Sequence, residues 1–194
     1  MASQNLQDFI ELTFPATLVA DAPAVPVSVQ DEVLALFDEC GPGIRRYVAS
    51  FNLEGAATED VVQDVFLALF RHLSLGRPTT NLQGWLFQVA HNLALKQRHR
   101  TAKRGLIEGA WDAAFADHVL DNGLNPEERL AERQRQRHLV RVLRLLPERD
   151  QRCISLRAEG LCYRDIAKTL GVSLGSVAKS VVRSIGRLSA ADME

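Results

Sequence analysis

Tyr163-Arg-Asp-Ile-Ala-Lys-Thr-Leu170, followed by Gly171-Val-Ser173, decides the fold of the C-terminal part of this 194-residue chain. The first eight residues have the apolar spacing of one short helix. Gly171 suits the left-handed turn that ends a helix, and Ser173 is a favourable cap for the next one. The stretch therefore predicts a helix-turn-helix motif, whose second helix typically enters the major groove of duplex DNA.

The helix after this turn is predicted to have an apolar face and a cationic face. The residues expected to be buried are Leu174, Val177, Ala178, Val181, Val182, Ile185 and Leu188. On the other face Lys179, Arg183 and Arg187 recur every four residues and form one stripe. Short polar residues followed by cations fit base edges and phosphates. The candidate duplex-binding residues are Ser173, Ser176, Lys179, Ser180, Arg183 and Arg187.

A charge reversal in the N-terminal half indicates a second nucleic-acid surface. Residues 1–70 contain eleven acids and two arginines, whereas residues 71–104 contain seven Lys and Arg and no acid. The basic stretch also holds aromatic and amide side chains, which can stack on exposed bases or hydrogen-bond to them. A solvated charged face is the alternative interpretation of either charge run.

Two long helices are predicted across this reversal. The first is expected to start at a Thr58 cap, with Asp60, Gln63 and Asp64 on its polar side. These acids have no cation on their own helix before Arg71, although acids in a first turn can also simply serve the helix dipole. The second helix is expected to start at an Asn81 cap. Its expected apolar face is Leu82, Trp85, Leu86, Val89, Ala90 and Leu93, and its expected outer face is Gln88, His91, Asn92, Leu95 and Lys96.

Glycine and proline residues predict where helices end and start in the rest of the chain. Gly41-Pro42-Gly43 is predicted to break the helical pattern that begins near Val33, with Pro42 starting the next helix. Asn125-Pro126 and Pro147 are predicted to start two later helices. Together with the low aromatic content of 6%, these patterns favour an all-α protein.

The composition also narrows the function. No apolar run approaches the ~18 residues needed to span a bilayer, and no Lys or Arg precedes Arg45, so we expect a cytoplasmic protein without membrane insertion. Cys40, Cys153 and Cys162 form no metal-binding spacing, so we expect no metal and no cofactor. Burial in a reducing compartment and a redox role both remain open for them. No nucleophile–base pair or phosphate-cradling glycine loop indicates an enzyme.

Five segments, in this order, resemble the bacterial sigma-70 family of transcription initiation factors, of the two-domain extracytoplasmic-function (ECF) type. They are Leu36–Tyr47, Thr58–Leu69, Trp85–Leu95, Leu146–Asp150 and Gly160–Ser173. The resemblance implies two small helical domains joined by a linker. We expect a poorly ordered arm over 1–28, a region 2-like domain over 29–104, a linker over 105–134 and a region 4-like domain over 135–194.

The resemblance also implies partners and sites. It implies binding to core RNA polymerase, with Asp60, Gln63 and Asp64 on the clamp helices of the β′ subunit and further contact at the β flap. It implies −35 duplex recognition by the helix-turn-helix domain and opening of the −10 region. The residues expected to capture the melted −10 strand are Pro78, Thr79, Thr80, Asn81, Gln88, His91, Asn92, Lys96 and Arg100. Family members are commonly held inactive by an anti-sigma factor, so one is an expected partner.

Three departures from the family pattern are visible. Lys96 stands where the family usually has Asp, and Cys162 stands where it usually has a capping Ser. The recognition helix reads Val177-Ala-Lys-Ser180 instead of the frequent Val-Lys-Ser-Arg, which displaces the cation by about 100° around the helix. A conventional helix-turn-helix regulator with a sensing or dimerising N-terminal half is the rival class. An enzyme with an accessory DNA-binding tail is a third class.

Overall fold

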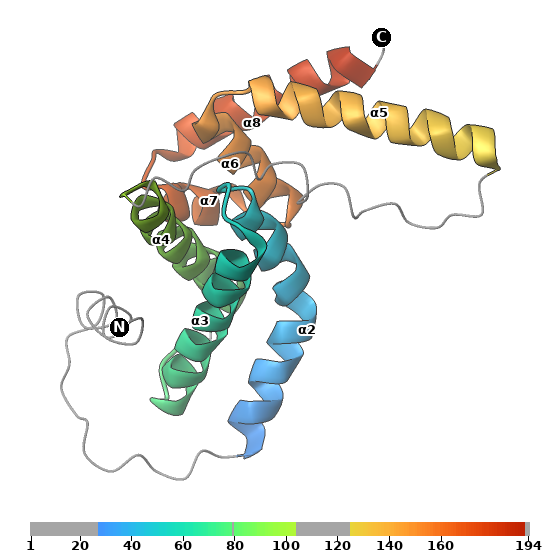
Figure 1. The fold of residues 1–194 in the computed structure, drawn as a ribbon. Coiled ribbons are helices and arrows are strands. Elements are labelled where there is room, and N and C mark those ends of the chain that lie inside the picture. Colours follow the sequence, from blue (N-terminus) through green and yellow to red (C-terminus); the bar gives the residue numbers. More distant parts are fainter. Residues whose placement is uncertain (1–26, 79, 104–124, 193–194) are drawn as a thin grey trace.

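The computed structural model describes residues 27–78, 80–103 and 125–192, and these residues form helices and connecting turns without any strand. The helices are α2 (Val27–Ala49), α3 (Gly55–Ser74), α4 (Leu82–Lys103), α5 (Pro126–Leu145), α6 (Glu148–Ala158), α7 (Tyr163–Leu170) and α8 (Leu174–Asp192). Helices α2 to α4 form one bundle, and α5 to α8 form a second group packed against one end of it (Figure 1). The all-α expectation is confirmed. Within the described ranges, no helix combines the length and apolarity that crossing a membrane requires.

Helix α2 runs straight through the predicted break. Pro42 lies inside the helix with its ring exposed, while Cys40, Ile44 and Val48 are buried on one side. A proline inside a helix costs about 3 kcal/mol, because it removes one backbone hydrogen bond and crowds the preceding turn. The expectation of two helices was wrong because residues on both sides of Pro42 face the same core, and burying them in one helix offsets that cost.

Helix α3 starts three residues before the predicted cap. Glu54 occupies the N-cap position, and Thr58 is buried within the first turn with its hydroxyl 3.5 Å from the Leu53 carbonyl. The side of this helix opposite Asp60 and Gln63 is apolar, and its Val61, Val65 and Leu69 are all buried. The cap assignment was wrong because Thr58 satisfies its hydroxyl by donating backwards to a carbonyl instead of accepting from a free backbone N–H.

The helix-turn-helix motif forms as predicted. Gly171 ends α7 in the left-handed conformation (φ 63°, ψ 34°), where a side chain would be strained. Ser173 caps α8, since its Oγ accepts a hydrogen bond from the Ser176 backbone N–H at 3.2 Å. The starts of α5 at Pro126 and of α6 after Pro147 are also confirmed.

A single continuous core joins the two groups of helices. Ile44, Phe51 and Phe87 of the N-terminal bundle belong to the same buried cluster as Leu156 and Ile166 of the C-terminal group. Helix α7 packs against α4, and α6 lies near the C-terminal end of α2 (Figure 1). The two groups of helices therefore form one compact unit, in which the C-terminal helices pack against the N-terminal bundle.

Candidate functional site

The acidic face predicted on α3 is at the surface. Asp60 and Gln63 are exposed, and Asp64 is half-buried. Burial raises the pKa of the Asp64 carboxyl, and the nearby Asp60 raises it further, while Arg100, Arg71 and Lys96 act in the opposite direction. Asp64 therefore lies within the field of cations from α4, which the sequence of α3 alone could not reveal.

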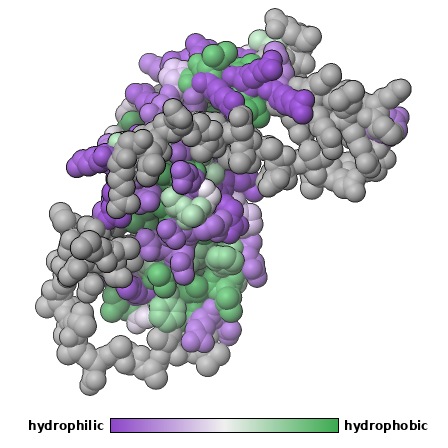
Figure 2. Space-filling model, viewed as in Figure 1, coloured by the Kyte–Doolittle hydropathy of each residue, from purple (hydrophilic) through white to green (hydrophobic). Residues whose placement is uncertain are grey.

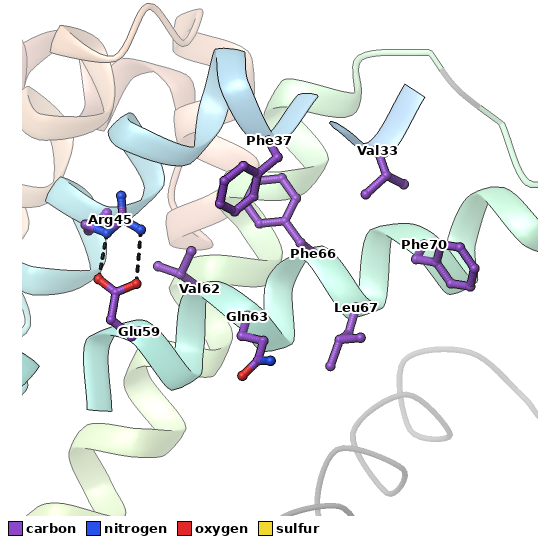
Figure 3. A pocket seen from close by; sticks show the side chains of 9 residues that line it. All are labelled: Val33, Phe37, Arg45, Glu59, Val62, Gln63, Phe66, Leu67 and Phe70. Atoms are coloured by element: carbon purple, nitrogen blue, oxygen red, sulfur yellow. Dashed lines mark hydrogen bonds and ion pairs between the residues drawn. The ribbon is translucent and has the colours of Figure 1, made fainter. Parts of the chain in front are cut away.

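An apolar groove borders this acidic face, and the sequence did not indicate it. Its walls come from α2 and α3, and Figure 3 shows the Phe37 ring of α2 meeting the Phe66 ring of α3. The lining residues are Val33, Phe37, Arg45, Glu59, Val62, Gln63, Phe66, Leu67 and Phe70. Phe37 packs edge-on against Phe66 with ring centroids 4.8 Å apart. Phe37 and Leu67 nevertheless remain 41% and 44% exposed.

An ion pair closes one end of this groove. The Arg45 guanidinium donates from Nε to Oε1 of Glu59 at 2.6 Å and from Nη2 to Oε2 at 3.0 Å. The Arg45 hydrogen bond lowers the pKa of the Glu59 carboxyl, although burial opposes this shift slightly. Figure 2 shows apolar surface beside hydrophilic surface over α2 and α3. The groove could have been suspected from Phe37 and Phe70, which lie at the margins of the apolar stripes.

The loop before α4 is held in a defined conformation. His72 Nε2 lies 2.9 Å from the Pro78 carbonyl oxygen, which ties the loop to α3. Asn81 has a left-handed backbone (φ 57°), and its Oδ1 accepts from the Gly84 N–H at 3.1 Å, which confirms the predicted cap. Pro78, Thr80 and Asn81 are exposed, and Thr79 lies outside the described residues.

On α4 the structure separates His91 from the other candidates. Gln88, Asn92, Lys96 and Arg100 are half-buried along the helix. His91 is only 8% exposed and shares a 2.8 Å hydrogen bond between its Nδ1 and the Tyr47 hydroxyl. Its expected place on an outer face was therefore wrong. Helix α4 is buried on two sides, against α3 and against α2, so one apolar stripe did not describe it.

The surroundings of His91 keep its imidazole neutral. Burial is the largest cause that lowers its pKa, Arg152 and Arg98 act in the same direction, and Glu148 opposes them, so that the pKa falls from 6.5 to about 4. Burial likewise raises the pKa of the Tyr47 phenol well above its usual value. Trp85, expected in the core, is partly buried against it, with its ring 4.5 Å from that of His72.

On α8 the predicted cationic face is largely exposed. Lys179, Arg183 and Arg187 are exposed, as is Ser173, and Ser176 is half-buried with its hydroxyl 2.9 Å from that of Ser173. Arg183 also lies 3.4 Å from a carboxylate oxygen of the buried Asp150. The helix thus presents cations to solvent while one of them is tied to α6.

The buried face of α8 differs from the predicted one. Ser180 is 1% exposed and lies beside the buried Val177 and Val181, so its expected place on the polar face of the helix was wrong. Val182 is 68% exposed, and Leu174 and Ile185 are about half exposed, at 54% and 50%. The neighbouring helices pack on the side of α8 that carries the small Ser180 and Ser184 side chains. The larger aliphatic residues therefore face solvent, although their hydrophobicity had predicted that they would be buried.

The cysteines do not share one environment. Cys40 and Cys153 are buried, as the structural interpretation expected, and burial raises the pKa of both thiols. Cys162 is exposed, at the N-cap position of α7, and its Sγ lies 3.0 Å from a carboxylate oxygen of Asp165. Within the described part of the chain, no cluster of three or more His, Cys, Asp or Glu has the arrangement of a metal site.

Comparisons with known proteins identify both halves. Sigma-70 region 2 matches residues 36–104, and Sigma-70 region 4 matches residues 136–188. The ECF RNA polymerase sigma factor SigE of Mycolicibacterium smegmatis is 32% identical over 142 residues, which are 72% of this chain and 54% of that protein. RNA polymerase sigma factor CarQ of Myxococcus xanthus is 28% identical over 152 residues, 76% of this chain and 81% of that protein. The chain thus spans about half the length of SigE.

Solved structures share the fold. The sigma factor RpoE in complex with the anti-sigma factor NepR from Bartonella quintana superposes with a TM-score of 0.61 at 22% identity, over 84% of this chain and 96% of that one. CnrH in complex with the cytosolic domain of CnrY gives 0.52 at 23% identity, over 83% and 87%.

Two helical regions in this order define a sigma factor. The chain belongs to the sigma-70 family, and its relatives place it among the ECF type. Sigma factors are regulatory subunits of RNA polymerase and not enzymes, which agrees with the expectation from the sequence.

Proposed function

We propose that this chain binds core RNA polymerase and directs promoter-specific initiation of transcription. The groove between α2 and α3 is the observation that carries the proposal. Exposed aromatic and aliphatic side chains next to the exposed Asp60 and Gln63 indicate a surface that a partner covers. Apolar contact supplies the affinity of such an interface, and the carboxylates of this face orient it toward a basic partner. This surface meets the clamp helices of the β′ subunit.

The promoter contacts come from the other two surfaces. Lys179, Arg187 and Ser173 on α8 are exposed where a recognition helix would meet the −35 duplex. The loop at Pro78, Thr80 and Asn81, with Gln88, Asn92, Lys96 and Arg100 of α4, forms the proposed track for the melted −10 strand. His91 and Ser180 are not part of either surface, because both are buried.

Two further elements follow from this function. An anti-sigma factor is a proposed partner of this chain. The structurally similar RpoE was solved with the anti-sigma factor NepR, and CnrH was solved with the cytosolic domain of CnrY. The domain limits of 29–104 and 135–194 and the cytoplasmic location are proposals as well. They agree with the two family matches and with the place where RNA polymerase acts.

Co-purification with core polymerase separates this function from its rival. A sigma factor is retained by immobilised core enzyme, whereas a dimeric helix-turn-helix regulator passes through and elutes as a dimer in gel filtration. Promoter opening is then tested by permanganate footprinting with Asn92→Ala. We expect thymines in the −10 region to lose reactivity on a matched template and to regain it on a template mismatched there. Equal reactivity of wild type and Asn92→Ala on the matched template would remove Asn92 from the opening surface.

A further inference from the structure

The outermost face of α8 carries an aliphatic side chain. Val182 is 68% exposed, whereas Ser180 and Ser184, two residues before and after it, are buried by the neighbouring helices. At about 100° per residue, Val182 therefore lies nearly opposite the buried face of the helix. A β-branched residue is a weaker helix former than alanine, and an exposed one adds little to the core. The fold of α8 alone therefore gives no reason for a valine at this position.

A shallow hollow surrounds Val182 on the surface of α8. Its lining residues are Ala178, Lys179, Val182 and Arg183, which belong to two parallel rows of the helix. Ala178 and Val182 make an apolar row, and Lys179 and Arg183 make a cationic row beside it. Each row is about 6 Å long at 1.5 Å per residue, or nearly twice the ~3.4 Å step between base pairs. The hollow therefore has the length of one or two base-pair edges.

Asp150 of α6 holds one wall of this hollow in place. Its side chain is 3% exposed, and its Oδ2 lies 3.4 Å from Nη1 of Arg183. Within the described part of the chain, this oxygen accepts no hydrogen bond. A buried carboxylate requires a compensating charge, so the ion pair keeps the Arg183 guanidinium beside Val182. This wall is therefore positioned before any ligand binds.

The charge around the hollow favours DNA over a protein as its occupant. No acid occurs between Gly171 and Ala191, and Lys179 is exposed. A protein that covered Val182 would also have to desolvate the neighbouring cations and supply a carboxylate to each. A duplex supplies phosphates along both edges of its major groove, and base edges between them. An apolar row with a cationic row beside it matches that arrangement.

Thymine is the base whose edge suits an apolar row. In the major groove, guanine, adenine and cytosine present only hydrogen-bond donors or acceptors as their distinguishing groups, whereas thymine also presents its C5-methyl group. Aliphatic side chains against the polar edges would leave donors and acceptors without partners, which is unfavourable. A methyl group against Ala178 and Val182 instead removes apolar surface from water.

Ala178 makes this hollow particular to the chain. It lies in Val177-Ala-Lys-Ser180, where the frequent family pattern Val-Lys-Ser-Arg has a lysine. A lysine at position 178 would stand next to Val182 and interrupt the apolar row. The alanine, with the cation displaced to Lys179, therefore creates a row that the frequent pattern does not have.

We propose that Ala178 and Val182 form a thymine-reading site on the recognition helix, which contacts the C5-methyl group of one thymine in the −35 duplex. Lys179 and Arg183 neutralise the DNA backbone beside that base. The inference rests on the proposed −35 recognition and names a base that this recognition requires. Promoters of this chain therefore carry, at one −35 position, a thymine whose methyl group contributes to affinity.

The test compares thymidine with deoxyuridine, which forms the same base pair but lacks the methyl group. The full-length chain, alone and bound to core polymerase, first selects duplexes from a library with a randomised central segment. Each thymidine of the recovered sequence is then replaced singly by deoxyuridine, and fluorescence anisotropy measures the affinity. We expect the replacement at one position to weaken binding about fourfold, which corresponds to about 0.8 kcal/mol for one buried carbon group.

Three variants identify the side chains that contact the methyl group. Val182→Ala shortens the exposed side chain, and Ala178→Lys fills the hollow with the residue of the frequent family pattern. Each should lower the ratio of thymidine to deoxyuridine affinity from about four to about one. Ile185→Ala is the matched control, since Ile185 is half exposed on the same helix but does not line the hollow, and it should keep the ratio near four. Circular dichroism verifies that all three variants keep their helix content.

Equal affinity for thymidine and deoxyuridine at every position would overturn the thymine-reading site and leave a protein partner as the occupant of the hollow. A ratio that persists in both Val182→Ala and Ala178→Lys, or that also falls to one in Ile185→Ala, would overturn the assignment of the contact to these two residues. Recovery of no shared sequence by either form of the chain would overturn −35 recognition and the thymine-reading site together.

The outcome separates this site from the proposed function. If the free chain shows the ratio and its loss in the variants but is not retained by core polymerase, the thymine-reading site stands and the sigma function fails. If the chain directs run-off transcription with core polymerase while the ratio is one at every position, the sigma function stands and the thymine-reading site fails.

Discussion

At the scale of single residues, His91 makes the stability of the folded chain depend on pH. Its pKa of about 4 in the folded state lies below the 6.5 of an exposed histidine. The unfolded chain therefore binds a proton first as the pH falls, so the free energy of unfolding decreases between about pH 6.5 and pH 4. Between pH 7 and pH 5 this single group should cost about 2 kcal/mol of stability.

Urea unfolding of wild type and of His91→Gln at both pH values measures this contribution. Glutamine keeps an acceptor for the Tyr47 hydroxyl but does not titrate. The variant should lose most of the difference between pH 7 and pH 5. A variant with the same pH dependence as wild type would show that His91 is not the group responsible.

Asp64 tests the polymerase-binding surface. Asp64→Lys reverses a half-buried charge beside the exposed Asp60 and places it near Arg71, Arg100 and Lys96. We expect affinity for core polymerase to fall at least tenfold in a fluorescence titration, because a basic partner would then meet a cation. Glu39→Lys, the same reversal on an exposed acid of α2, is the control and should bind nearly normally. Equal affinities for Asp64→Lys and wild type would remove this face from the interface.

At the scale of single elements, α8 carries both a stability prediction and a binding prediction. Gly186 lies inside the helix, is exposed, and has no atom within 4 Å of the position that a methyl group would take. Gly186→Ala should therefore stabilise the protein by about 0.5–1 kcal/mol, measured as a higher midpoint in urea. Gly84→Ala, where the methyl would meet Asn81 at 2.7 Å, should destabilise it. If both substitutions changed the free energy of unfolding in the same direction, this account of the two helices would be contradicted.

Lys179 is the cleaner probe of duplex binding on α8. Arg183 is tied to Asp150, so removing it would also leave a buried carboxylate without its partner. Lys179 is exposed on the same stripe. If Lys179 neutralises a phosphate, Lys179→Ala should weaken binding to all −35 duplexes equally and reduce the slope of log affinity against log salt by about 1. Loss confined to one base position would instead show that Lys179 reads a base.

The elements differ in how far the sequence determined them. The turn at Gly171 and the caps at Asn81 and Ser173 were predictable, because their chemistry is local to a few residues. The continuous α2 was not predictable, because burial on both sides of Pro42 outweighs a local helix breaker. His91 and Ser180 were misplaced because α4 and α8 are buried by more than one neighbour, which a single apolar stripe does not represent.

At the scale of the whole molecule, the sequence predicted two helical domains but not their contact. Arg46 and Glu159 are separated by 113 residues, and no periodicity relates them. Nothing in the sequence around Arg152 indicates a buried side chain, yet Arg152 is buried against Ser50 and Phe51. The apolar groove was missed for the same reason, since it exists only where α2 and α3 lie side by side. Tertiary pairing converts charges that look alike in sequence into binding surfaces and internal contacts.

The most direct measurement of the central claim is run-off transcription of genomic fragments by core polymerase, with and without this chain, followed by mapping of the start sites. The account predicts transcripts that appear only when the chain is present. Their start sites should be preceded by one shared pair of sequence elements near −10 and −35. The same set of transcripts with core polymerase alone, or no chain-dependent transcript from any fragment, would contradict it.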